Sequence, residues 1–376
     1  MKVYFDNAAT TPIHPLVTKE IMDIIQNYSG NPSSIHAEGR KARAKIEQAR
    51  KTIAQILNAS IGEIFFTSSA TEANNTIISN AVEHLQVRRI ITTATEHPCV
   101  INTVHDVHRK HEIQVVLLNL DEAGFYNLEE LQQHLEDDSA GKTLVSLMAG
   151  NNEIGTLHPI SEIGNLCVKY NSYFHSDAVQ VLGKFPLNVQ DFPIHFLSGT
   201  AHKMHGPKGI GMMYINNENM IPPLFTGGAQ ERNMRAGTEN VYGIAGFAKA
   251  FKLSVDGMAE NRKKITALRQ HMIDRLQNEF DDIEFNSPID SDYLYHILSV
   301  SFPSDSKNEM LIYNLDIKGI CASAGSACSS GTNVGSHVLH AIKPENPRHT
   351  IRFSFSHFNS IDEVDYVLDT LNEINI

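Results

Sequence analysis

The chain is poor in cysteine, carries fewer positive than negative charges, and has no long apolar run. Its four cysteines are irregularly spaced and include no Cys-x-x-Cys pair, which argues against a disulfide framework and against zinc or thioredoxin-like chemistry. A formal net charge of −12 disfavours nucleic acid as a partner. No segment is apolar over the length that a bilayer requires, and none resembles a signal peptide. We therefore expect a cytoplasmic protein with no membrane partner and no resident metal.

Strand and helix patterns alternate along the first two thirds of the chain. The apolar runs predict strands near residues 64–67, 89–94, 114–119, 143–148, 173–176, 195–198 and 210–215. Several of these runs are continuous, as a buried, mostly parallel sheet requires. A long amphipathic helix near 258–280 leads to a smaller α+β region that contains 297–302, 318–323 and 348–354. Because 376 residues exceed what one core usually holds, we expect an α/β fold with a large domain, residues 13–255, and a smaller domain, residues 256–376.

One lysine, Lys203, follows an apolar strand and the small residues of Ser198-Gly199-Thr200-Ala201. A rigid strand end can hold an amine where its neighbours keep it partly neutral, so that it attacks a carbonyl and later moves a proton. These are the demands on the Schiff-base lysine of a pyridoxal phosphate (PLP) enzyme. We therefore predict PLP as cofactor and Lys203 as a catalytic residue.

Two further strand ends carry polar side chains that suit the same cofactor. Asp177 ends the strand near 173–176, and its carboxylate can hold the pyridine nitrogen protonated, while Gln180 can hydrogen-bond the ring's phenolic oxygen. Taken alone, Asp-x-x-Gln is more typical of a helix N-cap. His97 follows residues 90–94, and its imidazole can stack on the ring or transfer protons, since its ordinary pKa is near neutrality. A structural loop histidine is the alternative interpretation.

A phosphate site is predicted where the strand near 64–67 meets Ser68-Ser69-Ala70-Thr71-Glu72. Ser69 and Glu72 have the spacing of a capping box, and the backbone amides of Ala70 and Thr71 would point out of the helix start towards an anion. An ordinary helix start gives the same pattern. However, ligands of parallel sheets collect at the carboxyl ends of the strands, where all these predicted residues fall.

In this combination the chain resembles the cysteine desulfurases, members of the class V aminotransferase group of fold-type I PLP enzymes. The resemblance covers nearly the whole chain through Tyr4-Phe5-Asp6-Asn7-Ala8-Ala9, Asn31-Pro32-Ser33-Ser34, Thr67-Ser68-Ser69-Ala70-Thr71-Glu72, Asn151-Asn152-Glu153-Ile154-Gly155, His202-Lys203, Arg235-Ala236-Gly237-Thr238, Ser326-Ala327-Cys328 and Ile351-Arg352-Phe353-Ser354. It implies a fold-type I transferase in which residues 1–12 join the smaller domain. It also implies L-cysteine as substrate, with alanine and a persulfide as products, and sulfur transfer to acceptors such as an iron-sulfur scaffold.

Cys328 distinguishes this group from its aminotransferase relatives. It lies among small residues between Ala322 and Gly331, and such a loop is expected to be exposed and mobile. A thiolate that attacks a substrate sulfur and carries it outward needs both properties. We therefore predict Cys328 as the nucleophile, against the plainer reading of a surface cysteine. The other three cysteines, Cys99, Cys167 and Cys321, are predicted to be small core residues.

The resemblance also implies roles that spacing alone does not give. It assigns Thr200 and His202 to the cofactor phosphate and Asn151 to the cofactor and substrate region. It assigns Arg352 to the substrate carboxylate, which a planar guanidinium can bind in bidentate fashion, although a strand-end ion pair is the alternative. Thr238 would reach the phosphate of a partner subunit, which implies a homodimer with shared active sites.

Two alternatives to cysteine desulfuration stay open on the sequence alone. The nearer is another class V PLP enzyme, such as a selenocysteine lyase or an aminotransferase with a different substrate. The other is a non-catalytic scaffold with the same fold, which the presence of Lys203, Asp177 and Cys328 disfavours.

Overall fold

The computed structural model describes residues 1–290, 292–304, 310–325, 336–344 and 348–374. Cys328 therefore lies outside the described residues. In those ranges, no helix is both long enough and apolar enough to cross a membrane.

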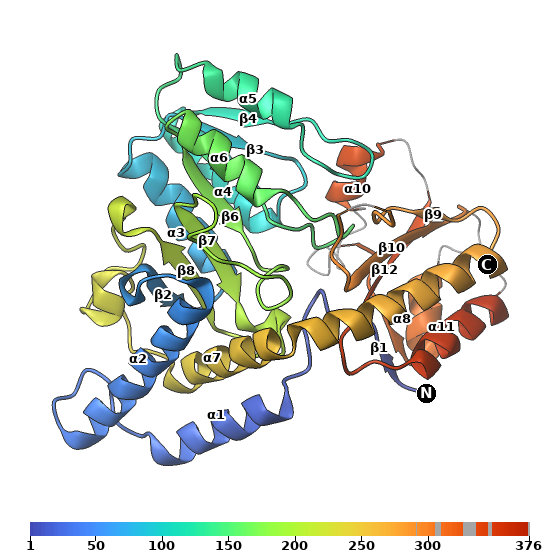
Figure 1. Cartoon of the computed structure of the whole chain (residues 1–376), viewed down its shortest axis with the longest axis horizontal. Helices are drawn as coiled ribbons and strands as arrows, with labels where there is room; N and C mark the ends of the chain where they lie inside the picture. Colours follow the sequence, from blue (N-terminus) through green and yellow to red (C-terminus); the bar gives the residue numbers. More distant parts are fainter. Residues whose placement is uncertain (291, 305–309, 326–335, 345–347, 375–376) are drawn as a thin grey trace.

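A seven-stranded sheet forms the centre of the molecule (Figure 1). The strand order is β2-β8-β7-β6-β5-β3-β4, and only β8 runs antiparallel to its neighbours. The mostly parallel sheet of seven strands is thus confirmed, close to the predicted positions. The strands are β2 (Ile64–Thr67), β3 (Arg89–Thr92), β4 (Gln114–Leu117), β5 (Thr143–Ser146), β6 (Tyr173–Asp177), β7 (Phe196–Thr200) and β8 (Gly211–Ile215).

Both faces of this sheet are covered, which explains the continuous apolar runs. Phe65 and Ile90 pack with the apolar residues of α3 and α4 on one face, whereas Phe66 and Ile91 pack with those of α2, α6 and α7 on the other. Successive side chains of a strand point to opposite faces, so neighbouring apolar residues serve two separate cores. The helices are α1 (Pro15–Asn27), α2 (Ala37–Leu57), α3 (Ala70–Glu83), α4 (Pro98–His111), α5 (Leu128–Glu136), α6 (Ile160–Lys169) and α7 (Val241–Asp256).

The chain after Gly257 forms a smaller α+β region, at the right of Figure 1, which α8 joins to the central sheet. Its antiparallel sheet has the order β12-β10-β9, and the N-terminal strand β1 pairs in parallel with β11. The predicted helix near 258–280 and the predicted strands are present here. The elements are β1 (Val3–Tyr4), α8 (Met258–Glu279), β9 (Glu284–Phe285), β10 (Ile297–Phe302), α9 (Leu311–Ile317), β11 (Ile320–Cys321), α10 (His337–Ile342), β12 (His349–Ser354) and α11 (Ile361–Glu373).

The predicted capping box at the start of α3 is only half formed. The Ser69 hydroxyl accepts the Glu72 N–H at 3.2 Å, as predicted. The Glu72 carboxylate instead accepts the N–H of Ser68 at 2.8 Å and forms an ion pair with Arg235 at 2.9 Å. A capping box would also need a hydrogen bond from the Ser69 N–H to the Glu72 carboxylate, and this part of the prediction was wrong. The carboxylate pairs instead with Arg235, which is distant in the sequence.

Candidate functional site

The carboxyl ends of the central strands surround a cavity of about 230 Å³. Most of the predicted site residues line it, although they come from elements far apart in the sequence. They are Ala70, Thr71, His97, Asp177, Gln180, Thr200, His202, Lys203 and Arg352. The parallel-sheet rule therefore correctly predicted that these residues lie close together.

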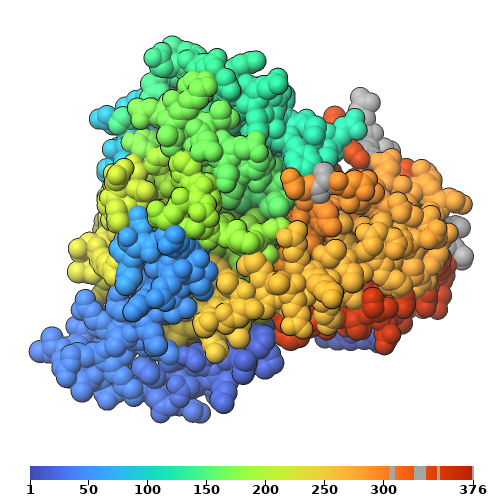
Figure 2. All heavy atoms as spheres, in the orientation of Figure 1, coloured from blue at the N-terminus to red at the C-terminus, as the bar shows by residue number. Residues whose placement is uncertain are grey.

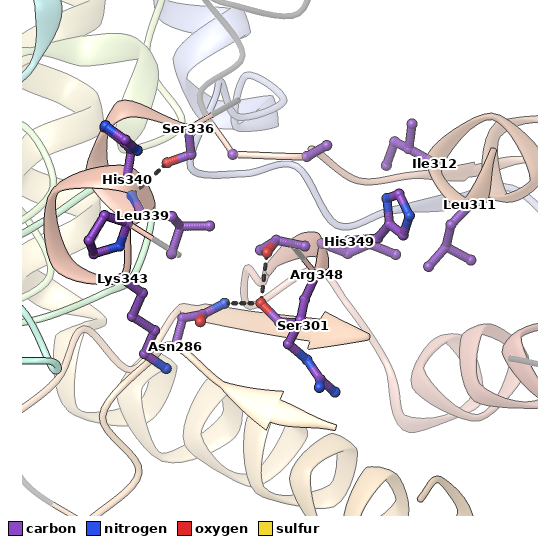
Figure 3. Close-up of a pocket in the computed structure, with 15 residues that line it drawn as sticks. Asn286, Ser301, Leu311, Ile312, Ser336, Leu339, His340, Lys343, Arg348 and His349 are labelled. Carbon is purple, nitrogen blue, oxygen red and sulfur yellow. Dashed lines mark hydrogen bonds between the residues drawn. The ribbon is translucent and has the colours of Figure 1, made fainter. Parts of the chain in front are cut away.

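A larger hollow, of about 340 Å³, lies in the C-terminal region (Figure 3). A chain of hydrogen bonds runs along its wall, since the Asn286 amide donates to the Ser301 hydroxyl at 2.8 Å and Ser301 contacts the Thr350 hydroxyl at 2.7 Å. No predicted site residue lines this hollow. We therefore assign the chemistry to the smaller cavity, where a lysine, a buried carboxylate and a helix N-terminus converge.

Asp177 is a buried carboxylate at the end of β6. One of its oxygens accepts from the Asn74 amide at 2.7 Å, and the other accepts the Val179 N–H at 3.0 Å. His175 contacts the Asn74 oxygen at 3.1 Å and thereby holds that amide in place. The residues after Asp177 form turns, so it does not cap a helix. A fixed, acceptor-only group of this kind suits a protonated ring nitrogen.

The N-terminus of α3 forms the opposite end of the cavity. Gly211 on β8 approaches it so closely that a Cβ atom there would lie 2.5 Å from the Ser69 carbonyl carbon. Thr200 donates to the carbonyl of Ile210 at 3.0 Å, and His202 contacts the Thr10 hydroxyl at 3.2 Å. Burial lowers the pKa of His202 to about 4, and Lys203 adds to this shift. Backbone amides, hydroxyls and a neutral imidazole thus gather where an anion would bind.

Lys203 is the last residue of a short 3₁₀ turn, η2 (Ala201–Lys203), after β7. Its amine donates to the carbonyls of Ala8 at 2.5 Å and Ala9 at 2.7 Å, which also line the cavity. Behind it, the Lys184 amine donates to the Lys203 carbonyl at 2.9 Å. Burial, with a smaller effect of the Lys203 charge, lowers the pKa of Lys184 to about 7. Sequence reasoning missed Lys184, since nothing near it in the chain marks it as a neighbour of the catalytic turn.

His97 caps the N-terminus of α4 and faces the cavity. Its Nδ1 accepts the Cys99 N–H at 3.2 Å and lies 3.0 Å from the Cys99 sulfur. Burial lowers the pKa of His97, although the charge of Asp177 opposes this shift. A neutral ring whose Nδ1 accepts carries its proton on Nε2.

Arg352 forms one wall of the cavity from β12. Its Nη1 donates to the Asn152 carbonyl at 2.9 Å, and its Nη2 pairs with the Asp6 carboxylate at 3.0 Å. Its buried Nε has no hydrogen-bond partner among the described residues. The Ser323 hydroxyl donates to the same Asp6 oxygen at 2.8 Å. Sequence reasoning gave Asp6 no role, because it is 346 residues away from Arg352.

Two predicted residues do not line the cavity. The Asn151 side chain is buried and accepts the N–H groups of Glu153 at 2.8 Å and Ile154 at 3.1 Å, so it shapes the turn beside the cavity. Thr238 lines a separate hollow with Arg235. The cofactor roles of both therefore stay predictions.

The predictions for two of the other three cysteines need correction. Cys167 is buried, as predicted, but Cys99 and Cys321 are only partly buried. Cys99 lines the cavity, because α4 starts at the carboxyl edge of the sheet and turns this residue towards it. Burial raises the pKa of the Cys99 thiol to about 12, and the nearby Asp177 charge contributes. Cys99 is therefore a protonated thiol rather than a nucleophile.

The cavity fits PLP on its own features. It combines an amine, a buried carboxylate held by two hydrogen bonds, and the N-terminus of α3, against which β8 can pack closely because residue 211 is glycine. These groups match an aldehyde, a pyridine nitrogen and a phosphate respectively.

Residues 3–367 match the family described as aminotransferase class-V. The chain is 39% identical to a cysteine desulfurase IscS of Dictyoglomus turgidum, over 99% of this chain and 94% of that protein. A solved structure of a NifS-like protein superposes with a TM-score of 0.91 at 37% identity, covering 100% of this chain and 99% of that one. The structure of SspA in complex with cysteine has a TM-score of 0.81 at 31% identity, covering 96% of this chain and 100% of that one.

The chain therefore belongs to the class V aminotransferase family, whose members of this type depend on PLP. Its similarity to cysteine desulfurases extends over nearly the full length of both chains, so it belongs to their branch of that family.

Proposed function

We propose that this enzyme removes sulfur from L-cysteine, releasing L-alanine and leaving the sulfur as a persulfide on Cys328. The observation that carries this proposal is the convergence of Lys203, Asp177 and Arg352 in one cavity beside the N-terminus of α3. Each of these groups suits a different part of an amino-acid substrate or of PLP.

Asp177 would hold the ring nitrogen of PLP, Gln180 its phenolic oxygen, and Lys203 its aldehyde carbon. The amides of Ala70 and Thr71, with Thr200 and His202, would hold the phosphate. When bound, PLP withdraws electrons from the substrate and makes its Cα proton acidic.

Arg352 would bind the substrate carboxylate. Asp6 and the Asn152 carbonyl fix two of its nitrogens, while Nε is the buried nitrogen that lacks a described partner. A substrate carboxylate can pair with the guanidinium where it lines the cavity, and an arginine held in this way loses little side-chain entropy on binding.

Lys203 would take the Cα proton once the substrate has displaced it from the cofactor. The Lys184 amine holds the backbone carbonyl of Lys203, which helps to fix the turn from which Lys203 would act. His97 would carry a proton on Nε2 and donate it to the reacting groups, and Asn151 would hold the turn that shapes this side of the cavity.

Cys328 would complete the reaction as a thiolate. Its sulfur forms a bond to the substrate sulfur, and the bond from that sulfur to Cβ breaks with its electron pair staying on carbon. A proton added to that carbon gives alanine. Free cysteine and the Cys328 thiol thus become alanine and a persulfide, with no external oxidant.

The proposal is tested by incubating the PLP-loaded protein with L-cysteine and a reductant and measuring alanine and sulfide together. Equal amounts of the two products are expected. Neither product, or turnover of L-selenocysteine that far exceeds that of L-cysteine, would contradict the proposed substrate. A parallel reaction with L-alanine controls for sulfide carried over with the protein.

We also propose that the enzyme is a homodimer with shared active sites. Apolar side chains are exposed on and beside α1, in the segment that stands out at the lower left of Figure 2, and at the start of α7: Ile13, Leu16, Met22, Ile25, Ile35 and Tyr242. Thr238 lines a separate hollow and not its own cavity, as it would if it served a partner's phosphate. Arg235, three residues before it, pairs with Glu72 of α3 and steadies this loop.

Light scattering is expected to give twice the mass of one chain. The double variant Leu16→Glu/Ile25→Glu is expected to shift the protein towards monomer and to lose activity with it, because charges would replace apolar contacts. Lys19→Glu, an exposed change on the same helix, serves as the matched control. A wild-type mass of one chain, or a monomeric variant of full activity, would refute shared sites.

The remaining assignments are proposals of the same kind. The chain divides into residues 13–255 and a smaller domain of 1–12 and 256–376, which the pairing of β1 with β11 supports. A cytoplasmic location suits a reactive thiol, which needs a reducing compartment. An iron-sulfur scaffold or another protein thiol would accept the sulfur.

A further inference from the structure

Glu153 is a buried carboxylate that contacts the chain on both sides of residues 326–335. On the far side, the Ser336 hydroxyl donates to its Oε2 at 2.5 Å. On the near side, a Cβ atom on Gly325 would lie 3.2 Å from the same oxygen and 3.1 Å from the Ser336 Cβ. The two flanks of this segment therefore meet at one carboxylate.

His337 strengthens the attachment of the far flank. Its Nε2 donates to the carbonyl of Glu96 at 3.0 Å, and its Nδ1 lies 3.8 Å from Glu153 Oε1. Below these polar contacts, Val338 and Ile342 of α10 pack on Ile154. The start of α10, where Figure 3 shows Ser336, is thus fixed to the segment that follows β5.

The near flank is tied to the substrate corner. The Ser323 N–H and carbonyl pair with the backbone of Arg352 at 3.3 and 2.7 Å. The Ser323 hydroxyl also donates to Asp6, the partner of the Arg352 guanidinium. Asn152, next to Glu153, lines the cofactor cavity and accepts from the same guanidinium. Glu153 therefore links the two flanks to the wall of the reaction cavity.

Cys328 is three residues after Gly325 in the sequence. Three residues span at most about 11 Å, so an anchor at Gly325 bounds the reach of any group three positions further along the chain. Keeping a reacting group near its target raises its effective concentration, and small displacements of such a group can lower rates by roughly 10²-fold.

We propose that Glu153 is a positioning residue for the sulfur-accepting thiol, holding the two flanks of residues 326–335 together beside the cavity. This inference rests on the proposed role of Cys328. It assigns a function to a carboxylate that touches neither the predicted substrate nor the predicted cofactor groups among the described residues. Its effect falls on the sulfur-transfer step, not on binding of L-cysteine or removal of its Cα proton.

The test compares Glu153→Ala, Glu153→Gln and Ser336→Ala in the PLP-loaded protein. For Glu153→Ala, kcat for sulfide release is expected to fall roughly 10- to 100-fold. The cofactor absorbance change on adding L-cysteine, which precedes sulfur transfer, should keep its amplitude and half-saturation within about twofold of the wild type. Glu153→Gln retains an oxygen that accepts from Ser336, so it should recover most of the lost kcat. Ser336→Ala should resemble Glu153→Ala.

Two controls separate positioning from general damage. Ser360→Ala removes the serine cap of α11, matching the loss of the Ser336 cap on α10. Glu63→Gln alters a buried carboxylate at the amino end of β2, away from the cavity. Both should retain wild-type kcat.

Wild-type kcat in both Glu153→Ala and Ser336→Ala would overturn the inference. An absorbance response lost in parallel with kcat would also overturn it, since that pattern marks a structural role. If Glu153→Ala does not fold, the other two variants provide the test. Ser336→Ala should lose kcat while keeping the absorbance response, and Glu153→Gln should keep most of both. Failure of the proposed function itself is recognised separately, as a wild-type enzyme without alanine and sulfide or a Cys328→Ala variant with full turnover.

Discussion

Lys203→Ala is expected to abolish covalent attachment of PLP and to lower desulfuration by roughly 10²–10⁴-fold, because it removes the amine that binds the cofactor and moves the Cα proton. The protein should still take up PLP, since Asp177 and the N-terminus of α3 are unchanged. Borohydride reduction followed by mass spectrometry measures the first effect, and sulfide release measures the second.

The matched control for this change is Lys208→Ala, an exposed lysine five residues further along the chain. It should attach PLP and turn over normally. Borohydride-stable PLP on the Lys203→Ala protein would place the attachment at another lysine. Lys184 would then be the first to examine, since its amine already contacts the Lys203 carbonyl.

Cys328→Ala is expected to eliminate sulfide release while leaving the response to substrate intact. The thiol is the only group in the proposed scheme that receives sulfur, so its loss should lower turnover by several orders of magnitude. The cofactor absorbance should still change when L-cysteine is added, because Lys203 and Arg352 remain. Sulfide and alanine assays, with spectra recorded on the same samples, separate these two steps.

Cys321→Ala is the appropriate comparison, since it removes a partly buried thiol from β11. It should retain wild-type turnover. Sulfide release by Cys328→Ala at the wild-type rate would mean that another thiol accepts the sulfur. The thiol of Cys99, in the cavity beside His97, would then be the first to examine.

The fold and the position of the cavity followed from local patterns in the sequence. Strands buried on both faces are continuous apolar runs, so β2 to β8 were recognisable one by one. Once the sheet is parallel, its topology alone brings Asp177, His97 and Lys203 to one edge. Periodicity and the strand-end rule thus gave part of the cavity lining, whereas Thr200, His202 and Arg352 came from the family resemblance.

Contacts between residues far apart in the chain were not predictable in this way. Glu72 binds Arg235, which is 163 residues away in the sequence. Because of this pairing, the capping box predicted from the spacing of Ser69 and Glu72 is only half formed. Asp6 pairs with Arg352, and Asn74 donates a hydrogen bond to Asp177. In each pair the two residues are more than a hundred positions apart in the sequence. The orientation of Cys99 depends on where α4 docks on the sheet. Such partners are fixed by tertiary packing, which a single sequence does not display.

The pairing of Asp6 with Arg352 also constrains how the enzyme is made. Asp6 is synthesised 346 residues before Arg352, so the corner that would receive the substrate carboxylate forms only after the chain between them has been made. The central sheet can fold earlier, since β2 to β8 end at Ile215. A nascent chain can therefore form much of its cofactor cavity before it can bind an amino acid, so the site stays inactive until Arg352 has been synthesised.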